Sequence, residues 1–418
     1  MFQAANANHV QAKLEGASLM LNKEMQVNHP IAIKWLNELI RMTPTQNFSL
    51  ADIFKAYYLL GISYENGYGV RPNQVAAFKH YAMASILNGE ARLALAKYFI
   101  RGTVVKKDLD AAFLLMYSAY LKDRSLLEDI AQIVATVELV DGFEKYLVKQ
   151  TEYGDSDAYY LLGSNMLDGK IFAYQRLQGL TYLKKSVEMN NPYAYLLMAK
   201  ILQEGEFGEE QDVEKAQAYY KRAFYDKRTQ KEAVKYLIDY SKEQQDYETV
   251  FDYYTAIGDY NAAKEILLLL PPSEETESKD LFLKVKEYQR TLDPQDPKSP
   301  QLYQERLRMA ANAGYPAAAI EYAKLLKDYA KLIEVMEQNV RDDDPLWCYE
   351  LSMYYRAGGE ANKRRNADRA LYYLEKSAEY SYVPALYVLE KAYRTGNSSL
   401  NVKADAMKQQ AYARKLLD

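Results

Sequence analysis

The sequence of 418 residues contains very little of the chemistry that disulfide frameworks and zinc sites require, namely one cysteine, Cys348, and three histidines. A single cysteine excludes any disulfide within the chain, and it does not distinguish a reducing from an oxidising compartment. His9, His29 and His80 are far apart, and none belongs to an HxxxH or HExxH pair, the spacing that places two zinc ligands on one helix face. We therefore expect no metal and no other cofactor.

Long apolar runs and an excess of one charge are also missing. No run approaches the roughly 18 apolar residues that a membrane span needs, so we expect no such span. The 53 basic and 57 acidic side chains give a net charge of -4, which offers no reason to expect nucleic-acid binding. The first residues do not form a signal peptide. We expect a periplasmic or envelope location if a signal was removed before Met1, and a cytoplasmic one otherwise.

Tyrosine, by contrast, is abundant: the sequence contains 40 tyrosines, 12 phenylalanines and 2 tryptophans. A tyrosine has an apolar ring and a polar tip, so it suits half-exposed positions on a packed helix face.

An internal repeat organises most of the chain. The template is a small residue, a second small residue five positions later, a large residue three further on and a closing glycine after three more, as in Ala56, Gly61, Tyr64 and Gly67. Small residues let a neighbouring helix approach closely, and glycine supplies a left-handed helix end. Copies of this frame begin at Ala56, Ala91, Ala158, Ala194, Trp347 and Ala385.

A second helix is predicted after each copy. In 77–85, 216–223 and 370–378, small residues recur seven apart with aromatic residues between them. This spacing places one apolar stripe on each helix. One helix pair cannot bury its own stripe, but a stack of pairs can, which predicts an all-α solenoid.

The segments 56–61, 67–70 and 77–84, with Tyr64 and Gly89, resemble the Sel1-like branch of the tetratricopeptide repeat superfamily. The resemblance implies a right-handed α-solenoid of roughly ten to eleven helix-turn-helix repeats of about 36 residues. Prolines cluster between Pro271 and Pro300. We therefore predict an N-terminal repeat block over 1–270, a proline-rich joint with one short helix over 271–300, and a C-terminal block over 301–418; the alternative is a long loop without hinge motion.

The resemblance also implies a binding surface, because the residue three before the second small position lines the concave face in solenoids of this type. In this chain four tyrosines occupy that position, with basic residues at neighbouring ones. We predict that they bind an acidic protein segment or an anionic polymer. The alternative is that the tyrosines pack between helices and the basic groups are only solvated. The predicted residues are Tyr58, Tyr160, Tyr349, Tyr387, Lys97, Lys391, Arg356 and Arg394.

The expected function is that of a non-catalytic scaffold or adaptor for protein–protein interaction, because no acid–base or nucleophile set is assembled in the sequence. The stretches 313–316 and 348–351 resemble the repeat scaffold of bacterial exopolysaccharide secretion, such as alginate export, which implies a role in an envelope secretion complex. The alternative is a secreted or effector-like protein that interacts with a host.

The repeat frame makes one prediction about stability. Replacing Gly61 by Leu should lower the free energy of unfolding by about 1–3 kcal/mol, because a neighbouring helix leaves no room for a larger side chain. Urea denaturation of this variant and of the wild type measures the change, and an unchanged midpoint for Gly61→Leu would contradict the repeat frame.

Overall fold

The computed structural model describes residues 10–21, 28–45, 48–290, 299–339, 345–356, 366–379 and 382–417. The chain divides into two compact units, residues 1–175 and 176–418. Within the described residues the structure consists of helices, with two isolated bridges, Thr45–Phe48 and Asn397–Val402, and no sheet. The predicted all-α fold is confirmed.

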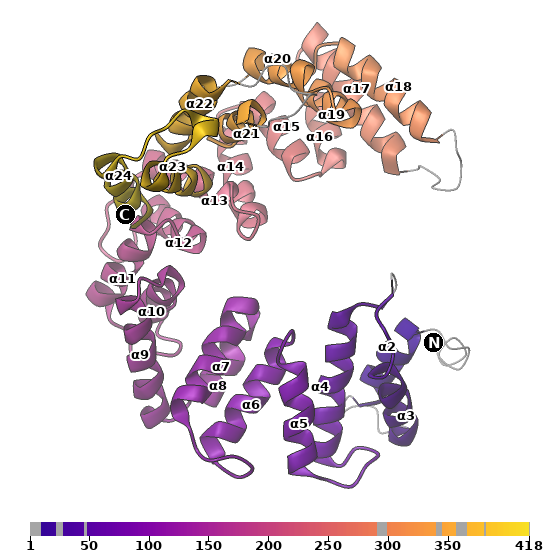
Figure 1. Cartoon of the computed structure of the whole chain (residues 1–418), viewed down its shortest axis with the longest axis vertical. Coiled ribbons are helices and arrows are strands. Elements are labelled where there is room, and N and C mark those ends of the chain that lie inside the picture. Colours follow the sequence, from indigo (N-terminus) through magenta and orange to yellow (C-terminus); the bar gives the residue numbers. More distant parts are fainter. Residues whose placement is uncertain are drawn as a thin grey trace. The chain divides into compact units, whose positions relative to one another are not determined.

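The first unit contains eight longer helices and two short ones among its described residues, and most of them pack on the preceding helix in chain order (Figure 1). They are α2 (Val10–Met20), α3 (His29–Leu39), α4 (Leu50–Asn66), α5 (Gln74–Ala84), α6 (Gly89–Arg101), α7 (Leu109–Lys122), η1 (Arg124–Leu126), α8 (Leu127–Ile133), α9 (Val137–Glu152) and α10 (Ser156–Asp168).

The second unit continues the same pattern of helix pairs, of which α12–α13, α21–α22 and α23–α24 share the most extensive contacts. Its elements are α11 (Arg176–Glu188), α12 (Pro192–Glu204), α13 (Val213–Phe224), α14 (Gln230–Glu243), α15 (Tyr247–Ala256), α16 (Tyr260–Leu267), α17 (Glu274–Arg290), α18 (Ser299–Asn312), α19 (Pro316–Leu326), α20 (Tyr329–Asn339), α21 (Pro345–Arg356), α22 (Ala367–Glu379), α23 (Val383–Thr395), η2 (Ser398–Leu400) and α24 (Ala406–Leu417).

Closing glycines end the first helix of four repeats as predicted, whereas Gly396, after α23, has φ 77° and ψ 153° and is not in the left-handed helical conformation. Gly67, Gly102, Gly169 and Gly205 follow α4, α6, α10 and α12 in the left-handed conformation, with φ between 67 and 79°. Glycine adopts this conformation without the steric cost that a side chain would bring. The corresponding Gly358 lies outside the described residues.

Small residues permit the close helix contacts on which the stack is built. A Cβ atom added to Gly61 would lie 2.5 Å from Cδ1 of Tyr81, so the ring of α5 packs directly on the backbone of α4. Ala56, Ala91 and Ala96 are completely buried. The close approach predicted from the repeat frame at Gly61 and Ala96 is confirmed.

Tyrosine hydroxyls join one helix to the next. Tyr81 of α5 donates a hydrogen bond to Glu65 of α4 (2.6 Å), and Tyr355 of α21 donates one to Glu337 of α20 (2.5 Å). Equivalent bonds run from Tyr220 to Gln203 (2.9 Å) and from Tyr393 to Glu375 (3.2 Å). The ring is buried while the polar tip is satisfied, which avoids the cost of an unpaired buried hydroxyl.

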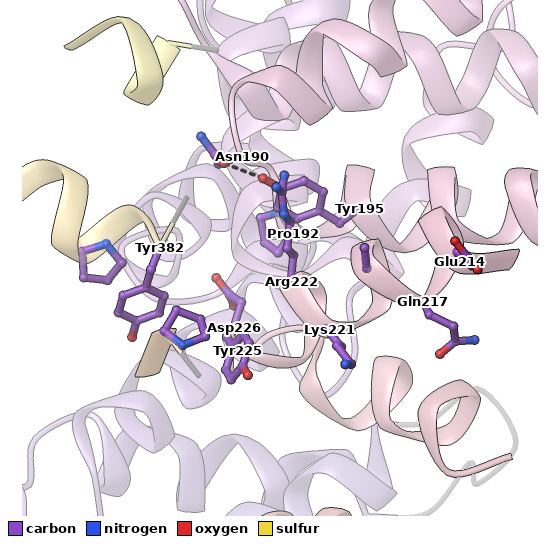
Figure 2. A pocket seen from close by; sticks show the side chains of 13 residues that line it. Asn190, Pro192, Tyr195, Glu214, Gln217, Lys221, Arg222, Tyr225, Asp226 and Tyr382 are labelled. Atoms are coloured by element: carbon purple, nitrogen blue, oxygen red, sulfur yellow. Dashed lines mark hydrogen bonds between the residues drawn. The ribbon is translucent and has the colours of Figure 1, made fainter. Parts of the chain in front are cut away.

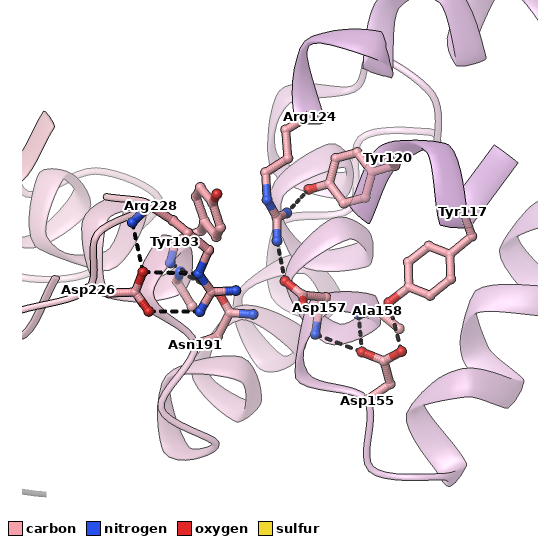
Figure 3. Close-up of polar contacts among 11 residues, drawn as sticks. Tyr117, Tyr120, Arg124, Asp155, Asp157, Ala158, Asn191, Tyr193, Asp226 and Arg228 are labelled. Atoms are coloured by element: carbon pink, nitrogen blue, oxygen red, sulfur yellow. Dashed lines mark hydrogen bonds and ion pairs between the residues drawn. The ribbon is translucent and has the colours of Figure 1, made fainter. Parts of the chain in front are cut away.

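A comparable network fixes the end of α7 within the first unit. Tyr117 donates to Asp155 (2.8 Å), the N-cap of α10, and Arg124 bonds both Tyr120 and Asp157 (Figure 3). These contacts connect α7 and η1 with the start of α10 across the intervening α8 and α9.

The segment predicted as a joint, 271–300, lies inside the second unit, and its residues 291–298 are outside the described part of the chain. Its helix, α17, packs between α16 and α18. Lys286 of α17 forms an ion pair with Glu321 of α19, and Tyr303 of α18 bonds the same carboxylate. A hinge at this segment stays a prediction.

The buried, hydrogen-bonded tyrosines predict a loss of stability at alkaline pH. Burial, followed by the charge of Glu65, raises the pKa of Tyr98 to about 12, whereas an exposed tyrosine titrates near about 10. Because the folded pKa is higher, the stabilisation is complete below about pH 10 and is lost as pH rises through about 12.

The free energy of unfolding should therefore fall between pH 9 and pH 12, and it should fall less in Tyr98→Phe, which lacks this ionisation. At pH 8 the variant should be less stable than the wild type by about 1 kcal/mol, because its bond to Gln74 is lost. Urea midpoints across this pH range measure both effects. An equal pH dependence in the two proteins would contradict the role assigned to Tyr98.

Candidate partner-binding surface

The four predicted tyrosines are all at least partly accessible, but three of them also make internal contacts. The ring of Tyr58 lies 5.9 Å from that of Tyr81. Burial raises the pKa of Tyr58, and the negative charge of Glu90 raises it further. The guanidinium of Arg124 covers the ring of Tyr160 at 5.2 Å.

Tyr349 and Tyr387 belong to the second unit. Tyr349 is half-buried and packs edge-on against Tyr382 at 5.3 Å, whereas Tyr387 is 59% exposed. Neither is fully buried between helices. Tyr58 and Tyr160 lie in the first unit, and a continuous line of the four tyrosines stays a prediction.

The predicted basic residues differ in how far their charges are already neutralised. Lys97 and Lys391 are exposed, and the described residues provide no carboxylate partner for either. Arg394 instead holds both oxygens of Glu390, at 2.6 and 2.7 Å, and Gln409 donates to the same carboxylate. The bonds from Arg394 and then Gln409 lower the pKa of Glu390. Nη1 of Arg356 lies 3.4 Å from Sδ of Met353.

The second unit contains a pocket of about 450 Å³ that the sequence analysis did not find (Figure 2). One wall is a stripe along α13 whose members recur every three or four residues, the spacing of one helix face. The stripe consists of Glu214, Gln217, Ala218, Lys221, Arg222 and Tyr225. The start of α12 forms a second wall, with Pro192 and Tyr195, and Tyr382 lies on a third side.

The fold of α13 explains why this stripe is accessible. Asp212 caps the helix by accepting a bond from the amide of Lys215 (2.9 Å). Ala216, Tyr220 and Ala223 are completely buried and form the packed face. Tyr220 also stacks on Tyr236 of α14 at 4.6 Å. With α13 held on both sides, the remaining face carries the stripe.

Arg222 is held in place by aromatic rings rather than by a carboxylate. Its guanidinium lies 5.5 Å from the ring centre of Tyr195 and 5.9 Å from that of Tyr219, distances that allow cation–π attraction. Burial raises the pKa of Tyr195, and the nearby Arg222 charge opposes that shift. The cation is therefore oriented while its charge is not neutralised.

Asp226 lies four residues after Arg222, just past the end of α13 at Phe224, and is the nearest acidic residue to it in the sequence. The structure pairs Asp226 with Arg228 instead, whose amide, Nε and Nη2 donate to it at 2.8, 3.0 and 2.8 Å (Figure 3). Although partial burial opposes it, the bonds from Arg228 lower the pKa of Asp226. Among the described residues no carboxylate forms an ion pair with Lys221 or Arg222.

Gln217 gives the pocket a buried acceptor. Its side chain is 9% exposed, and its Oε1 is buried without a hydrogen-bond partner in the described part of the chain. An unpaired buried carbonyl of this kind is destabilising, so it marks a position where a bound molecule can supply an N–H.

The pocket's chemistry is that of recognition: aromatic walls, two cations, the acceptor of Gln217 and two carboxylates, the exposed Glu214 and Asp226, which is paired with Arg228. In the part of the chain that the structure describes, no group of three or more acidic, histidine or cysteine side chains could hold a metal ion. Cys348 is completely buried. No helix in the described ranges is long and apolar enough to cross a membrane.

The Sel1 repeat family matches the sequence at five positions, residues 54–88, 89–123, 156–191, 192–225 and 348–379. The fourth match comprises α12 and α13, the two helices that line the pocket. No curated protein matches the chain.

Two solved structures are similar to the chain. One is a protective antigen present in uropathogenic Escherichia coli strains that displays an SLR fold. It is 17% identical, with a TM-score of 0.28, and the match covers 98% of this chain and 84% of that chain. The other is a Sel1 repeat protein from Oxalobacter formigenes, with 22% identity and a TM-score of 0.26. The match covers 52% of this chain and 86% of that chain. At these TM-scores the family assignment depends on the sequence matches.

Proposed function

We propose that this chain, which belongs to the Sel1-like repeat family, is a non-catalytic adaptor that holds segments of partner proteins. Sel1 repeat proteins generally mediate protein–protein interaction, and the family is generally non-catalytic. The observation that carries the proposal for this chain is the exposed face of α13, where Lys221 and Arg222 lie beside aromatic walls and have no carboxylate partner among the described residues. Aromatic and arginine side chains are enriched where binding energy concentrates.

The predicted C-terminal surface supports the same function as a second contact region. Tyr387 and Lys391 are both exposed on α23, one helical turn apart. Arg394 is less suitable as a test position, because its truncation would leave the buried carboxylate of Glu390 without its cation. Tyr387 and Lys391 are therefore the positions at which this surface is best altered.

The narrower proposal is that the adaptor belongs to a bacterial envelope complex for exopolysaccharide secretion. It depends on the resemblance of 313–316 and 348–351 to such scaffolds. Packing also accounts for these residues, since Tyr315 is buried against Phe251 and Phe282, and Cys348 is completely buried. The alternative is a secreted protein that interacts with a host. The source of the captured partner, envelope or eukaryotic, distinguishes the two.

Affinity capture with the purified full chain, followed by mass spectrometry and calorimetry with the purified partner, tests the adaptor proposal. We expect one or a few proteins to bind directly, with affinity that falls as salt rises because surface charge contacts are screened. Tyr387→Ser with Lys391→Ser should weaken binding if the C-terminal surface takes part. If no captured protein binds directly and an anionic polymer such as alginate does, the adaptor proposal is wrong.

A further inference from the structure

We propose, on the basis of the adaptor function above, that the α13 pocket holds an extended segment of a partner protein with an acidic and a basic residue three positions apart. The segment's carboxylate lies at Lys221 and Arg222, a backbone N–H between the two charges donates to Gln217, and the basic group lies at Glu214. Each part of this pattern follows from a separate feature of the stripe.

The cationic end selects a carboxylate. Lys221 and Arg222 are adjacent and exposed, and the described residues supply no ion-pair partner for either. Arg222 is already oriented over two tyrosine rings, so little side-chain freedom is lost when it binds. Asp226, which would otherwise compete for Arg222, is occupied by Arg228.

The middle of the stripe selects a main-chain donor. Oε1 of Gln217 is buried and has no hydrogen-bond partner within the described ranges, and it can only accept a hydrogen bond. A backbone amide of a bound peptide satisfies this acceptor whatever the side chain of that residue is. Ala218 beside it, and Tyr225 at the C-terminal end of the stripe, offer apolar surface for small side chains of the segment.

The acidic end fixes the spacing. Glu214 and Lys221 are seven residues apart on one helix, which corresponds to about 10.5 Å along the axis. Three residues of an extended polyproline II segment span about 9 Å and return to the same face, so charges three positions apart reach both ends together. Gln217 lies between them, beside the central peptide groups of such a segment.

A protein segment fits this arrangement better than a uniform anionic polymer. A polyanion would place negative charge against Glu214, and a polyuronate has no amide N–H for Gln217. A peptide with charges of opposite sign matches both ends of the stripe and supplies the donor.

Fluorescence anisotropy with labelled, end-capped peptides tests the pattern on the full chain. The probes are Gly-Glu-Val-Ala-Lys-Gly and its reversed order, because the direction of the segment is open. We expect one order to bind at least about tenfold more tightly than versions with Gln in place of Glu or with the two charges adjacent. Equal binding of all the peptides, or binding of none, would overturn the proposal.

Variants of the stripe make the assignment specific. Lys221→Glu with Arg222→Glu should weaken binding at least about tenfold, whereas Lys227→Glu with Lys231→Glu, an equal charge change at exposed positions outside the pocket, should change it less than about threefold. Glu214→Lys should reverse the preference towards a peptide with glutamate at both positions. If the two double variants weaken binding equally, the pocket is not the site.

Gln217 is tested by two nearly isosteric changes. Gln217→Met removes the acceptor and should weaken binding about fivefold, and Gln217→Glu keeps an acceptor and should bind more tightly than Gln217→Met. Thermal melting shows whether each variant is folded. If both variants are folded and bind like the wild type, the role of Gln217 is wrong.

A final comparison separates this inference from the adaptor proposal. A partner captured by the wild type is tested against Lys221→Glu with Arg222→Glu. Loss of the partner supports the pocket. Retention at unchanged affinity overturns the pocket inference and leaves the adaptor function standing. If no protein partner binds the chain, the adaptor function fails, and the inference that rests on it fails as well.

Discussion

The stack depends on the contact between a small residue on one helix and an aromatic ring on the next. At Gly61 the ring of Tyr81 lies so close that even a methyl group would overlap it. This contact sets how near the two helices of a repeat lie, and the distance in turn lets Tyr81 reach Glu65 with its hydroxyl. Packing and hydrogen bonding therefore reinforce each other, and a change at the small residue disturbs both.

Because the inside of each repeat is fixed in this way, specificity has to come from the outward faces of the helices. In α13 the packed residues Ala216, Tyr220 and Ala223 follow the repeat pattern, while the stripe that contains Gln217 and Lys221 does not. The solenoid thus separates the residues that hold the fold from the residues that recognise a partner. The same separation explains why the fold alone says little about which partner is bound.

The sequence predicted the helices, the closing glycines and the close contact at Gly61, because each is a local rule of spacing and backbone conformation. The pairing of Arg394 with Glu390 also follows from the sequence, because the two residues are four apart on one helix. The pocket does not follow from the sequence. Arg222 and Asp226 have the same spacing, yet α13 ends at Phe224, before Asp226, and Asp226 pairs locally with Arg228. The burial of Gln217 likewise depends on the neighbouring helices.

Hydrogen exchange of the full chain, with and without a directly bound partner, tests most directly the claim that recognition occurs on the outward face of α13 while the stack stays unchanged. The account predicts that partner binding slows exchange of the amides in residues 213–225, whereas exchange in α4 and α5 is unaltered. Slowed exchange confined to other helices, with residues 213–225 unchanged at saturating partner, would contradict it.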